Sequence, residues 1–289
     1  MLKSQPTPLR HLPRSLLGEG PIWDYRTGTL YWVDINGGWL HAYRPRDGYT
    51  KSIRVGPFPS CVALNEDGNL VVTLKDRVVL LDPERGSILR VLATVDEGAD
   101  NRFNDCRCDP AGRLLAGTMN MPMPRKPTAS LYVLDLDLKV RRLLGGVTVS
   151  NGLTWSLDGS TLYYIDTPTR RIAVYSYDVK DGSITGVKGY IDLSAVQGNP
   201  DGMTIDSEGY LWVAMWGGGR VIRVEASSGK VVYTVSVDAR YTSSCTFGGS
   251  DLSTLFISTA MGEAPLENEG YLYRVDVGVR GVRQNLCKY

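Results

Sequence analysis

The stretch WSLDGSTLYYID (residues 155–166) decides the fold, because it has the pattern of a β-hairpin and recurs along the chain. Asp and Gly are typical of tight hairpin turns, and alternating Leu, Tyr and Ile favour a strand. Five further copies are WDYRTGTLYWVD (23–34), LNEDGNLVVTL (64–74), CDPAGRLLAGT (108–118), IDSEGYLWVAM (205–215) and FGGSDLSTLFI (247–257). The chain is therefore expected to be a repeat protein built from hairpins.

The spacing of these copies predicts the architecture. Five copies have a glycine in the turn, at positions 28, 68, 112, 159 and 209, and Leu252 takes that place in the sixth, so the intervals run from 40 to 50 residues. A second alternating pair of strands follows each copy. Four strands per unit and six units, without a helical stretch, predict an all-β, six-bladed β-propeller over residues 1–289 as a single domain. A two-sheet sandwich is the alternative, although sandwiches do not repeat a four-strand unit at one period.

A propeller must also close its ring. A strand from one terminus commonly pairs into the blade formed by the other, and the segment 9–17 or the tail 281–286 would serve.

The composition argues against charged macromolecular partners. In 289 residues, 32 Lys and Arg nearly balance 31 Asp and Glu, so no strong field favours nucleic acid or an anionic membrane. Prolines interrupt the first seventeen residues and no apolar run follows, which favours a cytoplasmic location. Five cysteines without CxxC spacing indicate buried thiols in a reducing compartment. Cys106 and Cys108 are interpreted as small core residues, with a shared metal as the alternative.

One position in each repeat carries a polar side chain. Counting eight residues back from each turn position, or nine in the first copy, reaches the start of the innermost strand, where side chains face the central channel. The six residues found there are Glu19, Ser60, Asn104, Asn151, Asp201 and Ser244. Pro200 fixes the approach of the chain to Asp201, and Gly202 removes bulk beside its carboxylate.

Two carboxylates and two carboxamides on one ring predict a cation site. Converging carboxylates raise each other's pKa unless a positive charge lies between them. Oxygen ligands without Cys or His suit Ca²⁺, Mg²⁺ or Mn²⁺. The alternative is that these residues close turns or satisfy backbone donors, as Asn and Asp often do.

The chain resembles the regucalcin (senescence marker protein), gluconolactonase and luciferin-regenerating enzyme family of six-bladed propellers. The matching phrases are LGEGPIWD (17–24), NRFNDCRCDPAGRLLAGTM (101–119), SNGLTWS (150–156), YIDTPTRRI (164–172), NPDGMTID (199–206), LWVA (211–214) and FGG (247–249). The resemblance implies a divalent ion held by Glu19, Asn151 and Asp201. It also implies substrate contacts by Arg102 and Asn104, with Asp201 as the general base.

The activity that the resemblance implies is metal-dependent hydrolysis of a sugar-acid lactone, a small molecule. The ion would polarise the lactone carbonyl, with Ca²⁺ the first expectation and Zn²⁺, Mn²⁺, Mg²⁺ or Fe²⁺ as alternatives. His11 and His41 lie outside the ring positions, so a Ser/His nucleophile has little support. Two alternatives stay open: an esterase or phosphotriesterase that uses the same site, and a calcium-binding propeller without catalysis.

One segment departs from the resemblance. Sugar-lactonase members are associated with a Glu just after the GTM phrase, whereas NMPMPRKPT (120–128) contains no acid. As a lid over the channel this loop would present Met, Arg and Lys side chains, which favours a less hydroxylated or an anionic substrate. The other interpretation is an ordinary stiff surface connection.

Overall fold

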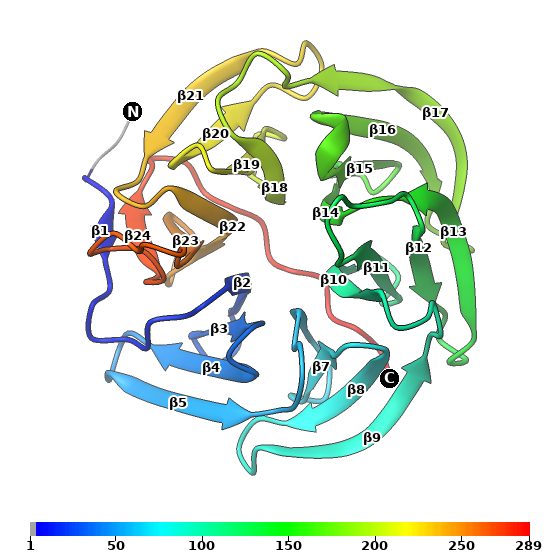
Figure 1. The fold of residues 1–289 in the computed structure, drawn as a ribbon, viewed down its shortest axis with the longest axis horizontal. Coiled ribbons are helices and arrows are strands. Elements are labelled where there is room, and N and C mark those ends of the chain that lie inside the picture. The colour runs from blue at the N-terminus through cyan, green and yellow to red at the C-terminus, as the bar shows by residue number, and fades with distance from the viewer. Residues whose placement is uncertain (1–3) are drawn as a thin grey trace.

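The computed structural model describes residues 4–289, which form a ring of antiparallel sheets around a central axis (Figure 1). Four sheets have four strands each, and in each sheet the chain runs from the inside of the ring to the outside. Their strands are β2 (Gly18–Asp24), β3 (Thr29–Asp34), β4 (Trp39–Arg44) and β5 (Tyr49–Arg54); β6 (Cys61–Leu64), β7 (Leu70–Thr73), β8 (Arg77–Asp82) and β9 (Ser87–Thr94); β10 (Asn101–Cys108), β11 (Leu114–Asn120), β12 (Ala129–Leu134) and β13 (Val140–Val147); β14 (Ser150–Trp155), β15 (Thr161–Asp166), β16 (Arg171–Asp178) and β17 (Ser183–Asp192).

The other strands form one eight-stranded sheet. They are β18 (Asn199–Ile205), β19 (Leu211–Trp216), β20 (Arg220–Val224), β21 (Val231–Ser236), β22 (Tyr241–Gly248), β23 (Thr254–Ala260), β24 (Tyr273–Asp276) and β1 (Thr7–Pro8). A single residue pair, Trp216 with Tyr241, joins β19 to β22. The prediction of an all-β propeller is confirmed, but only four of the six predicted blades are separate sheets, because this pair merges the remaining strands. The one helix within residues 4–289 is the 3₁₀ turn η1 (Thr167–Thr169).

The repeated turns have the geometry that the glycines predicted. Gly28, Gly159 and Gly209 have φ values of 68°, 76° and 83°, where a side chain would be strained. Leu252, which replaces glycine in the sixth repeat, still adopts φ 61°. The turn is therefore set by the repeat itself, and glycine is the residue that allows it at least cost.

The apolar core lies between neighbouring sheets. Val33 and Leu40 from the first sheet pack with Val62 and Val72 from the second in one buried cluster. Central strands are buried on both faces, so their apolar residues form near-continuous runs in place of strict alternation. No helix in the described part of the chain has the length and apolar character needed to cross a bilayer.

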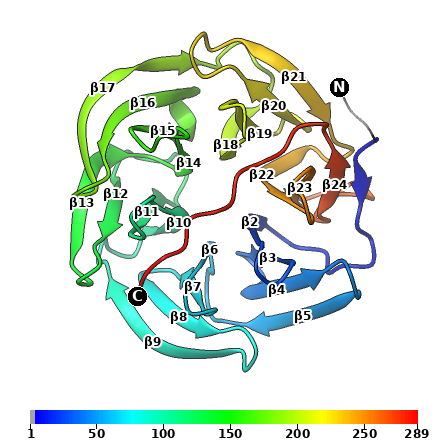
Figure 2. The same cartoon turned by 180° about the vertical axis from the view of Figure 1, so that it is seen from behind.

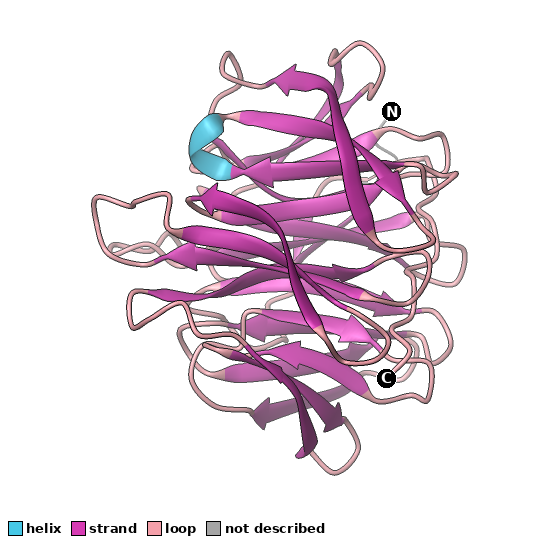
Figure 3. Ribbon diagram, turned by 90° about the vertical axis from the view of Figure 1, so that its right-hand side faces the viewer, coloured by secondary structure: helices cyan, strands magenta, loops and turns pink. Residues whose placement is uncertain are grey.

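The two chain ends hold the ring from different sides. Strand β1 pairs with β24, and Leu17 bridges to Ala260, so the N-terminal segment closes the ring. The pairing strand is Thr7–Pro8, just before the predicted segment 9–17, in which Leu17 alone forms a bridge. The tail instead crosses the centre of the ring (Figure 2), with a bridge from Gly281 to Asp206. In side view, η1 and the C-terminus lie at opposite faces of the ring (Figure 3).

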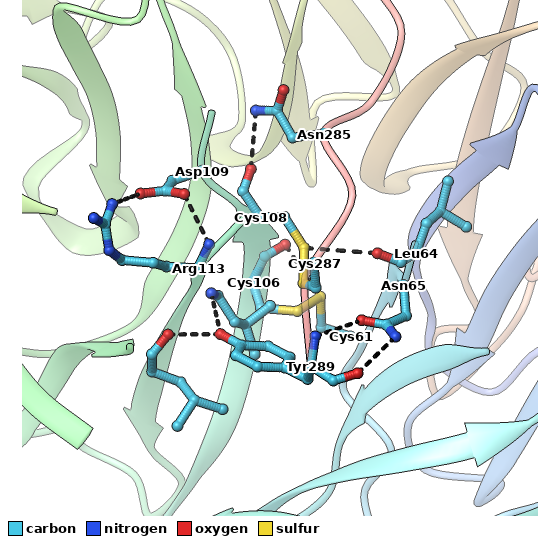
Figure 4. The surroundings of a disulfide bond; sticks show 12 residues. Cys61, Leu64, Asn65, Cys106, Cys108, Asp109, Arg113, Asn285, Cys287 and Tyr289 are labelled. Atoms are coloured by element: carbon cyan, nitrogen blue, oxygen red, sulfur yellow. Dashed lines mark hydrogen bonds and ion pairs between the residues drawn. A yellow bond between two sulfur atoms is a disulfide. The ribbon is translucent and has the colours of Figure 1, made fainter. Parts of the chain in front are cut away.

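Two disulfides correct the prediction of free thiols. Cys61 bonds to Cys106, and Cys108 bonds to Cys287, which ties the tail to β10 (Figure 4). Cys245 remains a buried free thiol. Each member of the Cys106 and Cys108 pair therefore has its own sulfur partner, which excludes a metal shared by their thiolates. Disulfides persist in oxidising environments, so the thiol argument for a cytoplasmic location no longer applies.

Candidate functional site

A β-bulge lies at the predicted ring position of five inner strands. The pairing register shifts in β2 after Glu19, in β14 after Asn151 and in β18 after Pro200. Equivalent shifts enclose Asn104 in β10 and end at Ser244 in β22. Asn104 and Asp201 are left out of the ladder, whereas Glu19 and Asn151 are the last paired residues before the shift. A bulge bends the strand and re-aims the side chains at this point, which favours the presentation of polar groups to the channel.

Glycines beside the bulges let the inner strands approach each other closely. A Cβ atom on Gly152 would lie 2.6 Å from the carbonyl oxygen of Asp201, and one on Gly202 would lie 2.1 Å from the Ser244 hydroxyl. Both distances are too short for a side chain. In the pairs Asn151–Gly152 and Asp201–Gly202, the first residue supplies a polar side chain and the glycine leaves room for the neighbouring inner strand.

The ring residues meet at a cavity of about 370 Å³ on the face that carries η1. Four predicted side chains from different inner strands line it, together with Arg102. The lining residues are Leu17, Glu19, Ile35, Arg102, Asn104, Met119, Arg125, Val149, Asn151, Thr167, Pro168, Asn199, Asp201 and Trp216. The walls are thus largely apolar and the charged groups are few, as in small-molecule sites generally.

A chain of hydrogen bonds fixes the amides. The Asn104 Nδ2 group donates to the Asn151 Oδ1 atom at 2.8 Å and to the Ser150 carbonyl at 2.8 Å. Asn151 Nδ2 in turn donates to the Thr167 hydroxyl at 2.7 Å. Thr167 Oγ1 donates to the Pro200 carbonyl at 2.8 Å, beside Asp201. The amide orientations are therefore set by strands β10, β14 and β18 together.

Neither of the two carboxylates is fully compensated, although Asp201 is buried and Glu19 is half-buried. Burial raises the pKa of Glu19 to about 8; Asp105 raises it further, and the Gly20 N–H and Arg102 lower it. Burial also raises the pKa of Asp201 well above its ordinary value, and the charges of Glu19 and Asp105 add to this effect. The Asp201 Oδ1 atom is buried and has no hydrogen-bond partner. An added positive charge would stabilise both ionised groups.

Comparison with known proteins places this chain in a family. The sequence profile described as the SMP-30/Gluconolactonase/LRE-like region matches residues 17–261. The chain belongs to the SMP-30/gluconolactonase/LRE-like family. It is 42% identical over 258 residues to "Putative sugar lactone lactonase YvrE" of Bacillus subtilis (strain 168), with 89% of this chain and 88% of YvrE covered.

Two solved structures show how closely the fold follows this family. A luciferin-regenerating enzyme superposes with a TM-score of 0.91 at 32% identity, covering 98% of this chain and 99% of that chain. A calcium-binding protein, regucalcin from Agrobacterium tumefaciens, superposes with a TM-score of 0.89 at 28% identity, covering 96% and 95%. The resemblance inferred from the sequence phrases is confirmed.

Two of the six predicted ring residues, Ser60 and Ser244, do not line the cavity. The Ser60 hydroxyl lies 2.9 Å from the Thr73 hydroxyl, where the two form a buried hydrogen bond. Ser60 precedes β6, which pairs with β7 in continuous register and has no bulge to turn the side chain inward. Ser244 packs against the backbone of Gly202 instead.

Sequence reasoning missed the buried carboxyl group of Asp105. Asp105, next to Asn104, accepts from the Cys106 N–H at 2.8 Å, and burial raises the pKa of its carboxyl while Arg107 lowers it. Arg107 donates to Gln284 of the tail at 2.8 Å and to the Met203 carbonyl at 3.0 Å. Strict alternation would place Asn104 and Asp105 on opposite faces, but both lie within the register shift of β10.

The donor chemistry fits a divalent cation. No three His, Cys, Asp or Glu side chains gather as a metal site in residues 4–289, so a cation would be held by two carboxylates and an amide. Glu19 and Asp201 supply the carboxylates, and Asn151 supplies a carbonyl oxygen with a second lone pair. The unpartnered Asp201 Oδ1 atom is the observation that favours a ligand at this position.

Proposed function

We propose that the protein is a metal-dependent lactonase that hydrolyses a sugar-acid lactone. The observation that carries this proposal is the convergence, in one cavity, of two carboxylates with raised pKa values beside a guanidinium and two amides. Perturbed titratable groups in a cleft are typical of catalytic sites. Membership of the family and the lactonase name of YvrE support the same reaction class.

Each site residue is given a role in this proposal, and Asp201 is given two. Glu19, Asn151 and Asp201 hold one divalent ion, with Ca²⁺ the first choice because the Agrobacterium relative is named as calcium-binding. When bound, the ion supplies Lewis acidity to the lactone carbonyl and keeps both carboxylates ionised. Asp201 accepts the proton of the attacking water as general base.

Arg102 and Asn104 are proposed to bind and orient the substrate. Arg102 Nη1 donates to the Phe103 carbonyl and to Asn104 Oδ1, both at 2.8 Å, which fixes the plane of the guanidinium. A guanidinium held in one plane presents its remaining N–H groups to substrate oxygens in a defined direction.

We also propose that residues 1–289 form one six-bladed propeller, in which the eight-stranded sheet counts as two blades.

The test is lactone hydrolysis by protein stripped of metal and then reloaded with Ca²⁺, Zn²⁺, Mn²⁺, Mg²⁺ or Fe²⁺. Aldonolactone hydrolysis should vanish after stripping and return with at least one ion. Acyl esters and a paraoxon-like phosphotriester are assayed in parallel, and activity on these alone would replace lactonase by esterase or phosphotriesterase. Metal-independent hydrolysis at the wild-type rate would contradict the proposal.

The second candidate function is calcium binding without turnover. The name of the Agrobacterium relative favours it, because that name records binding and no reaction. Calorimetric titration of Ca²⁺ into wild type and Asp201→Asn, combined with the assays above, separates the two. Tight binding with no hydrolysis of any lactone or ester would favour the binding function.

A further inference from the structure

The loop 121–128 places a second arginine, Arg125, at the cavity, and this bears on which substrate the site prefers. We propose that Arg125 and Arg102 form an anion subsite, and that the preferred substrate is a lactone bearing a carboxylate in addition to its ring ester. This inference rests on the proposed lactonase function and names its substrate class. It makes Arg125 a specificity-determining residue.

Arg102 is a buried cation that forms no ion pair within the described residues, although the charges of Glu19 and Asp201 act on it from across the cavity. Its side chain is 7% exposed and lines the cavity. Both of its hydrogen bonds use Nη1, and within residues 4–289 it takes part in no ion pair. A buried guanidinium without a hydrogen-bonded anion is costly, so an anionic group bound beside it is favoured.

Arg125 is held over the same cavity by the stiff loop 121–128. Its Nε atom donates to the Asn120 carbonyl at 3.1 Å, and its Nη1 atom lies 3.4 Å from the Met123 sulfur. Asn120 is buried and accepts from the Lys126 N–H at 3.0 Å, which anchors the loop. Arg125 forms no ion pair in the described residues, so its outer N–H groups stay available to a ligand.

The charge balance of the cavity also favours an anion. Its charged lining residues are Glu19, Asp201, Arg102 and Arg125. These four cancel, and a bound divalent cation would leave a net charge of about +2 on the cavity wall. A neutral aldonolactone offers only dipoles against this charge, whereas a carboxylate matches the planar fork of a guanidinium with two hydrogen bonds.

The test compares two lactones that differ in one group. Glucaro-1,4-lactone carries a carboxylate at C6, and glucono-1,4-lactone carries a hydroxymethyl group there. Wild type should have the higher kcat/KM on the glucaro-lactone, and Arg125→Gln should lower the ratio of the two kcat/KM values by about tenfold to a hundredfold, the range of one charge-assisted hydrogen bond. Arg125→Lys keeps the charge but loses the planar fork of donors, so its ratio of kcat/KM values should lie between those of wild type and Arg125→Gln.

The matched control is Lys126→Gln, which removes the same charge from the next residue, an exposed side chain outside the cavity lining. This variant should keep the wild-type ratio. Equal losses on both lactones in Arg125→Gln, or a wild-type preference for the neutral lactone, would overturn the subsite while leaving the lactonase function intact.

If neither lactone is hydrolysed, the proposed function fails and binding decides the subsite separately. Calorimetry in Ca²⁺ should then show tighter binding of the glucaro-lactone, lost in Arg125→Gln. Equal affinities for the two lactones would overturn the subsite as well.

Discussion

Asp201 and Asp206 belong to the same inner strand and its following turn, yet their environments are opposite. Both are buried, with exposed fractions of 5% and 0%. Asp206 accepts four hydrogen bonds, from the Glu208 N–H at 2.9 Å, the Tyr210 N–H at 3.0 Å, the Trp212 Nε1 atom at 2.8 Å and the Arg223 Nε atom at 2.7 Å. Asp201, at the cavity end, has one oxygen without any partner.

The difference separates structural from functional carboxylates. Asp206 is a satisfied charge, because an arginine and three further donors replace the water that it lost. Asp201 is kept at a cost in stability, since burial and two neighbouring acids oppose its ionisation. Burial alone therefore does not identify a functional aspartate, whereas the lack of hydrogen-bond donors and of a positive partner beside a buried carboxylate does.

Asp201→Asn should produce the largest effect on activity. Loss of a general base lowers kcat by about a hundredfold to ten-thousandfold. The free energy of unfolding of the metal-free protein at neutral pH should stay equal or rise, because an amide removes the repulsion with Glu19. Urea unfolding and lactone hydrolysis measure the two quantities. A marked loss of stability would show that Asp201 is structural, like Asp206.

Asp206→Asn should show the reverse pattern. Removing one partner of a buried ion pair leaves the Arg223 charge uncompensated and costs about 3–5 kcal/mol in unfolding free energy. Because Asp206 lies away from the cavity, the folded variant should keep its kcat/KM. Glu208→Gln is the control, since this partly exposed partner of Arg223 lies 2.6 Å from it and should contribute about 1 kcal/mol or less.

Cys287→Ser tests the face of the ring opposite the cavity. The Cys108–Cys287 disulfide closes a loop with a sequence separation of 179 residues, and its removal should lower the free energy of unfolding by about 3 kcal/mol. Wild type in reductant should lose at least as much stability, because Cys61–Cys106 is reduced as well. One free thiol per chain in the unreduced, denatured protein, against five after reduction, checks both pairings. Unchanged stability would mean that backbone bonds alone hold the tail.

The repeated hairpin could be predicted from the sequence because its signal is local. Turn residues and alternation act within a dozen residues, and their recurrence gave the ring positions of Glu19, Asn104, Asn151 and Asp201. Their roles in metal binding and catalysis stay predictions. Their shared position has a physical cause, since a register shift lies at or directly after each of these residues and bends the strand there.

Other features depend on contacts between distant parts of the chain. The partners of Cys61 and Cys108 are 45 and 179 residues away, and no local pattern indicates such a pairing. The merging of β19 with β22 through one residue pair is equally invisible in the sequence. Ser60 was misplaced because the repeat predicts a position, whereas the missing bulge of β6 decides the direction of the side chain.

His41 sharpens the comparison, because it is a buried titratable group outside the cavity. It lies 5.0 Å from the Trp32 ring and 2.8 Å from the Ser52 hydroxyl, and burial lowers its pKa from 6.5 to about 4 while Asp34 opposes the shift. Between these two pKa values the unfolded chain binds the proton and the folded protein does not. The stability that this group contributes is therefore complete above about pH 6.5 and is lost as the pH falls toward about 4.

The expected loss from His41 is about 2 kcal/mol between about pH 7.5 and pH 5. His41→Phe keeps a ring against Trp32 but cannot titrate, so its unfolding free energy should fall less over the same interval. Urea unfolding of both proteins at the two pH values gives the difference in slope. Parallel slopes would show that the imidazole is protonated inside the fold; a clear difference would show that burial keeps it neutral, so that a perturbed pKa arises here outside the cavity.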